Sequence, residues 1–168
     1  TIAAEDVALI VKSSSNSGSS ITITAAAVVV TDCDFRDIIA AGAAAWDDGV
    51  DCTRMGNCGG NSGNFTFTAA ADKYAVCGAA NKNWNDTIWA TSTGGATHIN
   101  NFPLPQDTAI IDDASFDANT TVRTLTVNYA RISGLDWQNT WANKALAITT
   151  ACSCYGPVLK LLDATHPV

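Results

Sequence analysis

The chain is poor in charged residues and has almost no glutamate. Only 15% of its 168 residues are charged, and Glu5 is the single Glu beside 15 Asp. A globular domain usually carries charge on about a quarter of its residues. Glu propagates helices, whereas Asp prefers helix caps and turns, so a helical surface would normally contain more Glu. This composition argues against a helical protein and indicates a chain rich in turns.

Basic residues and long apolar runs are also scarce. Nine Lys and Arg residues are scattered without a cluster, and the net charge is −7 with a pI near 4.4. Binding of nucleic acid requires several cations that neutralise phosphates, so we expect no nucleic-acid partner. The longest apolar runs, residues 25–30 and 38–46, are far shorter than the roughly 20 residues of a membrane-spanning helix. We therefore predict no membrane insertion, and the first residues lack the basic region and Leu-rich core of a signal peptide.

Residues used in catalysis are scarce as well. The two His are His98, in a polar stretch, and His166, and no Gly-x-Ser-x-Gly motif is present, so a Ser-His-Asp triad is not expected. The sequence contains neither a Cys-x-x-Cys zinc motif nor a Gly-rich phosphate loop followed by Lys and Ser or Thr. We predict no catalytic residue, no cofactor and no bound metal ion.

Clusters of Asp leave two alternatives open. Pairs of carboxylates can act as general acid and base, as in polysaccharide-cleaving β-helices. The candidate sets are Asp47 with Asp48, Asp112 with Asp113, and Asp32 with Asp34 and Asp37. Calcium prefers oxygen ligands, which Asp47, Asp48 and Asp51 would supply, although the spacing of an EF-hand is missing. The simpler interpretation is that these carboxylates accept hydrogen bonds from backbone N–H groups in hydrated turns.

Short strand-like segments dominate the rest of the sequence. Apolar residues make up 47% and are rich in Ala, while Thr, Ser, Asn and Gly supply much of the polar part. Alternating or β-branched segments predict strands over residues 7–11, 21–24, 28–33, 65–68, 74–77, 108–111, 122–127, 132–137, 145–149 and 158–162. We expect 74–77 to pair beside 65–68. Residues 47–63 and 81–101 are predicted loops, and only residues 35–46, interrupted by Gly42, could form a helix.

The spacing of these strands predicts an all-β fold. Short strands at even spacing fit a sandwich, a barrel or a β-solenoid. Small and β-branched apolar residues, with turns that lack Asn-Gly hairpin pairs, favour an irregular β-solenoid similar to a parallel β-helix; a β-sandwich or jelly roll is the alternative. We expect residues 1–20 to form an N-terminal strand and a flexible linker (Ser13–Ser20), followed by a single all-β domain over residues 21–168.

The six cysteines are compatible with disulfides. An even number fits three bridges in an oxidising environment. The most local pair is a possible disulfide between Cys52 and Cys58, which would close the short loop between them. The alternative is a set of small buried thiols that never oxidise.

The most specific motif spans residues 83–117. It combines a tryptophan pair, a Ser-x-Gly-Gly turn and two prolines before an apolar strand that ends in Asp and Ser. The matching residues are Trp84, Trp89, Ser92, Gly94, Gly95, Pro103, Pro105, Asp107, Asp112 or Asp113, and Ser115. Upstream, residues 32–38 read Asp-Cys-Asp-Phe-Arg-Asp-Ile, and residues 56–63 form a loop rich in Gly and Asn.

These segments resemble a pattern of β-helical virion surface proteins of tailed bacteriophages. Trp84 and Trp89 stand one residue closer together than in that pattern. The resemblance implies a location on a virion and supplies no catalytic residue. In physical terms the motif is a scaffold: Pro103 and Pro105 hold residues 102–106 extended, and Gly94-Gly95 permits a reversal with positive φ. The two indoles can close the edge of a core, with each N–H facing solvent or a carbonyl.

We therefore expect a non-enzymatic structural protein on the surface of a phage particle, as a capsid decoration or a tail or fibre component. Its expected partners are copies of itself, preferably in a trimer, other particle subunits, and host-surface glycans, because open strand edges need covering. One alternative is a subunit of an extracellular filament or adhesin that donates the strand at residues 7–11 to a neighbour. A second alternative is a polysaccharide-cleaving β-helix.

Overall fold

The computed structural model describes residues 9–14, 21–129, 131–154 and 159–160. Apart from two single-turn 3₁₀ helices, every element in these ranges is a β-strand, which confirms the predicted all-β class. Contacts divide the chain into two compact units: a first unit of Thr1–Ala69 with Leu104–Gln106, and a second unit of Ala70–Pro103 with Asp107–Val168. Contact units are not by themselves folding domains, so a single domain over residues 21–168 stays a prediction.

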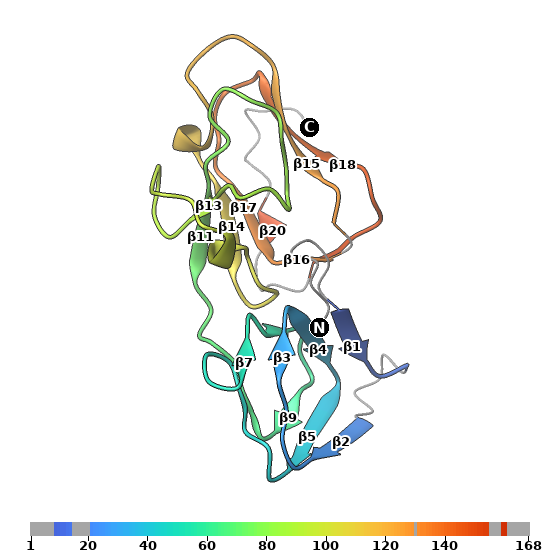
Figure 1. The fold of residues 1–168 in the computed structure, drawn as a ribbon. Coiled ribbons are helices and arrows are strands. Elements are labelled where there is room, and N and C mark those ends of the chain that lie inside the picture. The colour runs from blue at the N-terminus through green and yellow to red at the C-terminus, as the bar shows by residue number, and fades with distance from the viewer. Residues whose placement is uncertain (1–8, 15–20, 130, 155–158, 161–168) are drawn as a thin grey trace. The chain divides into compact units, whose positions relative to one another are not determined.

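The strands of the first unit are short, and several contain only two residues (Figure 1). The described strands are β1 (Leu9–Lys12), β2 (Ile21–Ala25), β3 (Val30–Thr31), β4 (Cys33–Arg36), β5 (Ile38–Gly42), β6 (Trp46–Asp47), β7 (Cys52–Thr53), β8 (Gly56–Asn57), β9 (Ser62–Gly63) and β10 (Phe65–Thr66). They form four groups in the orders β1-β4-β8, β2-β5-β9, β3-β7 and β6-β10.

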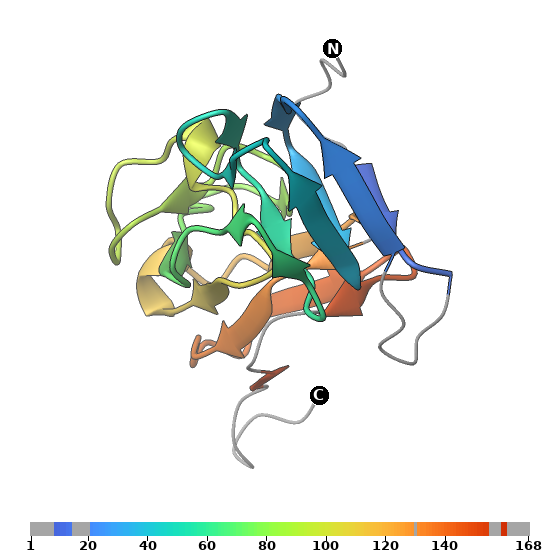
Figure 2. The same ribbon diagram turned by 90° about the horizontal axis from the view of Figure 1, so that it is seen from below.

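Every described strand pair in the first unit is parallel. Ile21 pairs with Ile38, and Leu9 pairs with Cys33, so partners are 17 and 24 residues apart in the sequence. Figure 2 shows the blue and teal strands of this unit running side by side. Because parallel partners cannot be joined by a tight hairpin, each pair requires the chain to travel around and return.

Residues with positive φ make the corners between these strands. Asp32 and Arg54 have φ of 53° and 54°, and they stand at equivalent corners, immediately after the paired strands β3 and β7. The Arg54 guanidinium donates two hydrogen bonds to the Asp32 carboxylate, and Asp32 N donates to Thr53 O at 3.0 Å. Left-handed backbone is rare for residues with a Cβ, so this ion pair helps to stabilise two unfavourable corners.

Aromatic and aliphatic side chains fill the core of the first unit. Its buried members are Cys33, Phe35, Ile38, Ala40, Ala44, Trp46, Cys52 and Met55. Phe35 and Trp46 lie with ring centroids 5.8 Å apart, and Phe65 lies 5.0 Å from Phe35 and 5.2 Å from Trp46. Aromatic rings bury large apolar areas, whereas Ala side chains bury little. The three rings therefore contribute much of the apolar area that this core buries.

The second unit contains both 3₁₀ helices and, like the first, strands of two to five residues. Its described elements are β11 (Asp72–Ala75), β12 (Lys82–Asn83), β13 (Trp89–Ala90), η1 (Ile99–Asn101), β14 (Thr108–Ile111), η2 (Asp113–Ser115), β15 (Arg123–Val127), β16 (Arg131–Ile132), β17 (Gly134–Trp137), β18 (Lys144–Ile148), β19 (Ser153–Cys154) and β20 (Leu159–Lys160). Its sheets have the orders β13-β11-β14-β17-β20, β12-β15-β18 and β16-β19.

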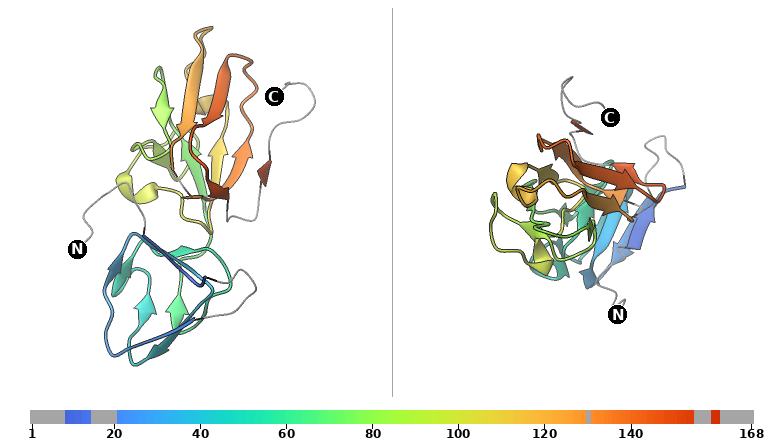
Figure 3. Two further views of the ribbon diagram at one scale, coloured as in Figure 1. Left: turned by 90° about the vertical axis from the view of Figure 1, so that its right-hand side faces the viewer. Right: turned by 90° about the horizontal axis from the view of Figure 1, so that it is seen from above.

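Parallel pairing also dominates the second unit. Thr108 pairs with Gly134, and Arg123 pairs with Lys144, which are 26 and 21 residues apart in the sequence. Figure 3 shows β15 and β18 side by side along their length. Only β11 with β13 is antiparallel among the described pairs. The core contains Ala75, Cys77, Trp84, Ile88, Trp89, Ala109, Ile111, Phe116, Leu125, Val127, Ile132 and Leu135.

Several predicted elements are confirmed and others are wrong. The strands predicted at 21–24 and 108–111 correspond to β2 and β14. The helix option for residues 35–46 is wrong, because Asp37 and Gly42 adopt positive φ and divide the segment into strands. Residues 47–63 contain β7, β8 and β9 instead of only loop. Residues 74–77 do not pair with 65–68, since β10 pairs with β6 and β11 pairs with β13 and β14.

Of the predicted linker Ser13–Ser20, residues 15–20 lie outside the described residues, as do residues 7 and 8 of the first predicted strand.

Candidate functional site

The tryptophan pair of the predicted motif lies in the core of the second unit. Trp84 and Trp89 are 0% and 1% exposed, with ring centroids 4.8 Å apart. Trp89 Nε1 donates to the backbone oxygen of Trp84 at 2.9 Å, as the sequence predicts. Trp84 Nε1 is buried and has no hydrogen-bond partner among the described residues, which the sequence does not predict. Both indoles therefore act in packing and are not presented to a ligand.

The turn and proline residues of the motif have local structural roles. Gly94 has a φ of 61°, as expected for a reversal, whereas Gly95 is not among the residues with positive φ. Pro103 O accepts a hydrogen bond from the buried guanidinium of Arg131 at 3.3 Å. Pro105 begins a turn, so residues 102–106, which the sequence predicts to be extended, are not extended over their whole length. Asp107 is 2% exposed, and its carboxylate accepts a hydrogen bond from Ala71 N at 3.0 Å.

The residue after Pro105 has a role that the sequence does not reveal. The Gln106 carboxamide accepts a hydrogen bond from Asn57 N at 2.9 Å and donates to Met55 O at 3.2 Å. It thus satisfies backbone groups along the β8 region of the first unit, from 49 residues away in the sequence. No local pattern marks such a contact, because it depends on the fold.

Burial keeps three of the cysteines in the thiol form by raising their pKa. Burial raises the pKa of the Cys33 thiol to about 12, and the neighbouring Asp34 carboxylate adds to that rise. Burial likewise raises the pKa of Cys77 to about 12 and raises that of Cys52. Cys52 is a free thiol, so the bridge predicted between it and Cys58 is not formed in this structure, and its formation on oxidation stays a prediction. Thiols with raised pKa are poor nucleophiles and poor metal ligands.

The Asp clusters are mostly engaged in hydrogen bonds. Asp113 accepts from Thr140 N at 2.7 Å and from the Thr140 hydroxyl, and Asp112 accepts from the hydroxyls of Thr93 and Ser115. Asp48 accepts from Thr68 Oγ1 at 3.2 Å. Asp113 thus accepts a hydrogen bond from a backbone N–H group, as the simpler interpretation of the sequence predicts, whereas Asp112 and Asp48 accept from hydroxyl groups.

The set around residue 34 does not present its carboxylates together. Asp32 binds Arg54, and the Asp37 carboxylate lies 3.5 Å from Arg36 Nε. Asp34 is fully buried, against Gly56. Across the described ranges there is no group of three or more His, Cys, Asp or Glu arranged to hold a metal ion. Within the same ranges no helix has the length and apolar character needed to cross a bilayer.

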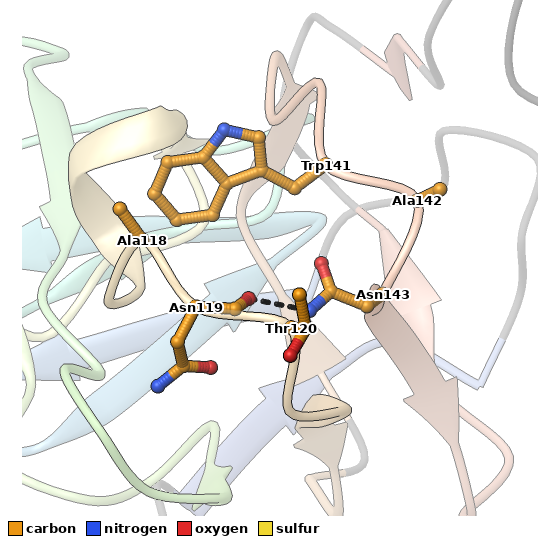
Figure 4. A pocket seen from close by; sticks show the side chains of 6 residues that line it. All are labelled: Ala118, Asn119, Thr120, Trp141, Ala142 and Asn143. Carbon is orange, nitrogen blue, oxygen red and sulfur yellow. Dashed lines mark hydrogen bonds between the residues drawn. The ribbon is translucent and has the colours of Figure 1, made fainter.

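An open hollow beside Trp141 is a candidate for a binding site (Figure 4). It has a volume of about 490 Å³ and lies between the loop before β15 and the loop before β18. Its lining consists of Ala118, Asn119, Thr120, Trp141, Ala142 and Asn143. The Trp141 indole is partly exposed, and it packs against the core of the second unit. The hollow therefore joins a large aromatic surface to backbone and side-chain amides.

Hydrogen bonds between the two loops fix the shape of the hollow. Asn143 Nδ2 donates to Asn119 O at 2.6 Å and to Thr121 O at 3.0 Å. The ammonium of Lys144 donates to the same two carbonyl oxygens, at 3.2 and 2.9 Å. Trp141 N donates to Asn139 Oδ1 at 3.1 Å, so the backbone beneath the indole is held as well. Hydrogen bonds therefore tie the two loops of the hollow to each other in this structure.

A second exposed feature is an apolar sheet edge in the first unit. Strands β1 and β2 stand at the ends of their sheets, and among the described strands they pair only with β4 and β5. Leu9 in β1 is 48% exposed, and Ile21 in β2 is 49% exposed. Val29, just before β3, is 86% exposed. An edge that combines unpaired backbone groups with apolar side chains tends to recruit another strand.

Comparison with known proteins gives no relative from which a function could be transferred: no family model, no curated protein and no solved structure matches the chain.

Proposed function

We propose that the chain is a non-enzymatic structural protein on the surface of a phage particle, built as an irregular β-solenoid that packs against copies of itself. The solenoid is proposed from the parallel pairings within each unit. The particle surface is proposed from the resemblance of residues 32–38, 56–63 and 83–117 to phage β-helical proteins. Hydrogen bonds from Asn side chains to the backbone support a scaffolding role.

The observation that carries the proposal is a recurrent use of Asn in the turns. Asn61 Oδ1 accepts from Ile38 N at 3.1 Å, and Asn61 Nδ2 donates to Phe35 O at 2.7 Å. Asn64 Nδ2 donates to Gly42 O at 2.9 Å, and Asn139 Nδ2 donates to Asp112 O at 2.9 Å. In each case the partner lies 22 to 27 residues earlier in the sequence. Asn side chains in turns that bind backbone groups in or beside strands of the preceding repeat are expected of stacked coils, in which each repeat contacts its neighbours.

The exposed edge of β1 and β2 supports self-association. A second copy can add strands to an open parallel edge and cover Leu9 and Ile21 at the same time. β1 itself pairs with β4 of its own chain from Leu9 to Lys12. That pairing favours addition of whole subunits over the alternative in which the first strand is donated to a neighbour.

Edge substitutions test the proposal. The double variant Leu9→Asp/Ile21→Asp places two carboxylates on the edge. Val50→Asp/Val122→Asp is the matched control, since Val50 and Val122 are 73% and 67% exposed and lie outside the strands. Sedimentation velocity should show an oligomer, with a trimer as the expected size, for the unmodified chain and the control. It should show a monomer for the edge variant, with an unchanged circular dichroism spectrum. An unmodified chain that stays monomeric over a wide range of concentration would contradict the proposal.

A further inference from the structure

We infer that the hollow beside Trp141 binds a short stretch of a neutral carbohydrate chain. The inference concerns the second unit alone and does not depend on self-association at the edge of the first unit. It rests on the shape, the lining chemistry and the charge of the hollow.

The size and openness of the hollow suit part of a polymer. Its volume of about 490 Å³ lies within the roughly 300–1,000 Å³ that is usual for ligand sites. Ala118, Asn119 and Thr120 on one side and Ala142 on the other are exposed to solvent. A ligand could therefore fill the hollow with one or two rings while the rest of its chain continues into solvent.

The lining offers the two kinds of contact that a sugar ring requires. An indole face carries partial negative charge and packs well against the positively polarised C–H face of a pyranose ring. The Asn143 carboxamide uses its nitrogen to hold Asn119 O and Thr121 O. No described residue donates to Asn143 Oδ1, and Figure 4 shows this oxygen on the side where the indole lies. It is available to accept a hydrogen bond from a sugar hydroxyl.

The lining of the hollow offers no charge to an ionic ligand. None of the six lining side chains is charged. The nearby Asp117 carboxylate is paired with the Arg123 guanidinium at 3.6 Å, and the Lys144 ammonium is held by Asn119 O and Thr121 O. Lys144 lies 5.6 Å from the centroid of the Trp141 ring and would repel a cation there, while the net charge of −7 of the whole chain disfavours an anion. The hollow therefore suits an uncharged ligand rich in hydroxyl groups.

A blocking substitution tests the site without removing any contact of the fold. Ala118→Arg places a long side chain over the hollow, where its guanidinium can cover the indole. Ala96→Arg is the matched control, because Ala96 is exposed in a separate loop of the same unit. Trp141→Ala removes the aromatic surface, and Trp141→Phe keeps a smaller ring. The probes are a panel of neutral gluco-, galacto-, manno- and N-acetylglucosamine oligosaccharides, with sialylated and sulfated glycans and nucleotides as competitors.

Saturation-transfer NMR and calorimetry should detect at least one neutral oligosaccharide with a dissociation constant on the order of 1 mM or tighter. Ala118→Arg and Trp141→Ala should weaken its binding tenfold or more, Trp141→Phe less, and Ala96→Arg not at all. The monomeric edge variant should bind as the unmodified chain does, which separates this result from the test of self-association. No binding to any neutral oligosaccharide, binding to ionic probes alone, or equal binding by the Ala118→Arg and Ala96→Arg variants would overturn the inference.

Discussion

Replacement of Gly42 by Ala should destabilise the protein because of the strand beside it. Gly42 ends β5 with a φ of 93°, and its partner in the ladder is Ala25 of β2. A Cβ built on Gly42 would overlap the backbone oxygen and nitrogen of Ala25. Those atoms belong to a paired strand and cannot rotate away as a flexible side chain would. Gly63 repeats the arrangement against Ala40 in the next strand pair.

Gly49 provides a matched control that separates two costs. Its φ of 100° is similar, but nothing lies within 4 Å of a Cβ built there. Left-handed backbone costs a residue with a Cβ about 1–2 kcal/mol, partly offset by about 0.4–1 kcal/mol of lost freedom in the unfolded chain. Gly49→Ala should therefore cost about 1 kcal/mol. Gly42→Ala adds the cost of overpacking, about 1–3 kcal/mol, and should reach about 2–4 kcal/mol.

Urea unfolding followed by circular dichroism measures both variants. With a slope of about 2 kcal/mol per molar urea, the midpoint should fall by about 1–2 M for Gly42→Ala and by about 0.5 M for Gly49→Ala. Gly63→Ala should behave like Gly42→Ala. If the free energies of unfolding of Gly42→Ala and Gly49→Ala agree within about 0.5 kcal/mol, the close approach of adjacent parallel strands at this corner is refuted.

Two further predictions concern buried thiols and the corner ion pair. Because burial raises the pKa of Cys33 and Cys77 from 9.0 to about 12, unfolded thiols ionise first, so stability should be complete below pH 9 and fall from pH 9 toward 12. A double Cys33→Ala/Cys77→Ala variant should lose less stability over that range in urea titrations, and an identical loss would refute this assignment. Arg54→Lys replaces the two-pronged contact with Asp32 by a point charge and should cost about 1 kcal/mol. That is more than the cost of Arg36→Lys, because Arg36 Nε lies 3.5 Å from the Asp37 carboxylate, beyond hydrogen-bond distance for an N–H donor. If the two Lys variants lose the same free energy of unfolding, the two-pronged contact between Arg54 and Asp32 does not have the stabilising role assigned to it here.

The sequence predicts strands well where they are long enough to have a period. Thr108–Ile111 is flanked by Asp107 and Asp112, and its apolar residues are β-branched or small, so its bounds could be predicted. β7, β8 and β9 could not be predicted, because two residues have no period. Gly56, for example, becomes a strand residue only because it pairs with Asp34, 22 residues earlier. Long-range pairing overrides local propensity at such positions.

The candidate site was less predictable than the fold. The sequence directs attention to Trp84 and Trp89, since they belong to a recognisable motif, yet both are buried. Trp141 carries no motif, and its partners arrive from a loop more than twenty residues earlier. The available signal was the Asn and Thr content around residues 119–121 and 139–143, which marks two turns. That these turns are adjacent follows only from the pairing of β15 with β18.

Immunogold electron microscopy tests the proposed function most directly. Antibodies against the purified chain would be applied to intact particles and cells from the source of its gene. We expect gold label at regular positions on the surface of tailed phage particles, without permeabilisation. Label confined to cell-attached filaments, or absent from particles altogether, would contradict a structural role on the phage surface.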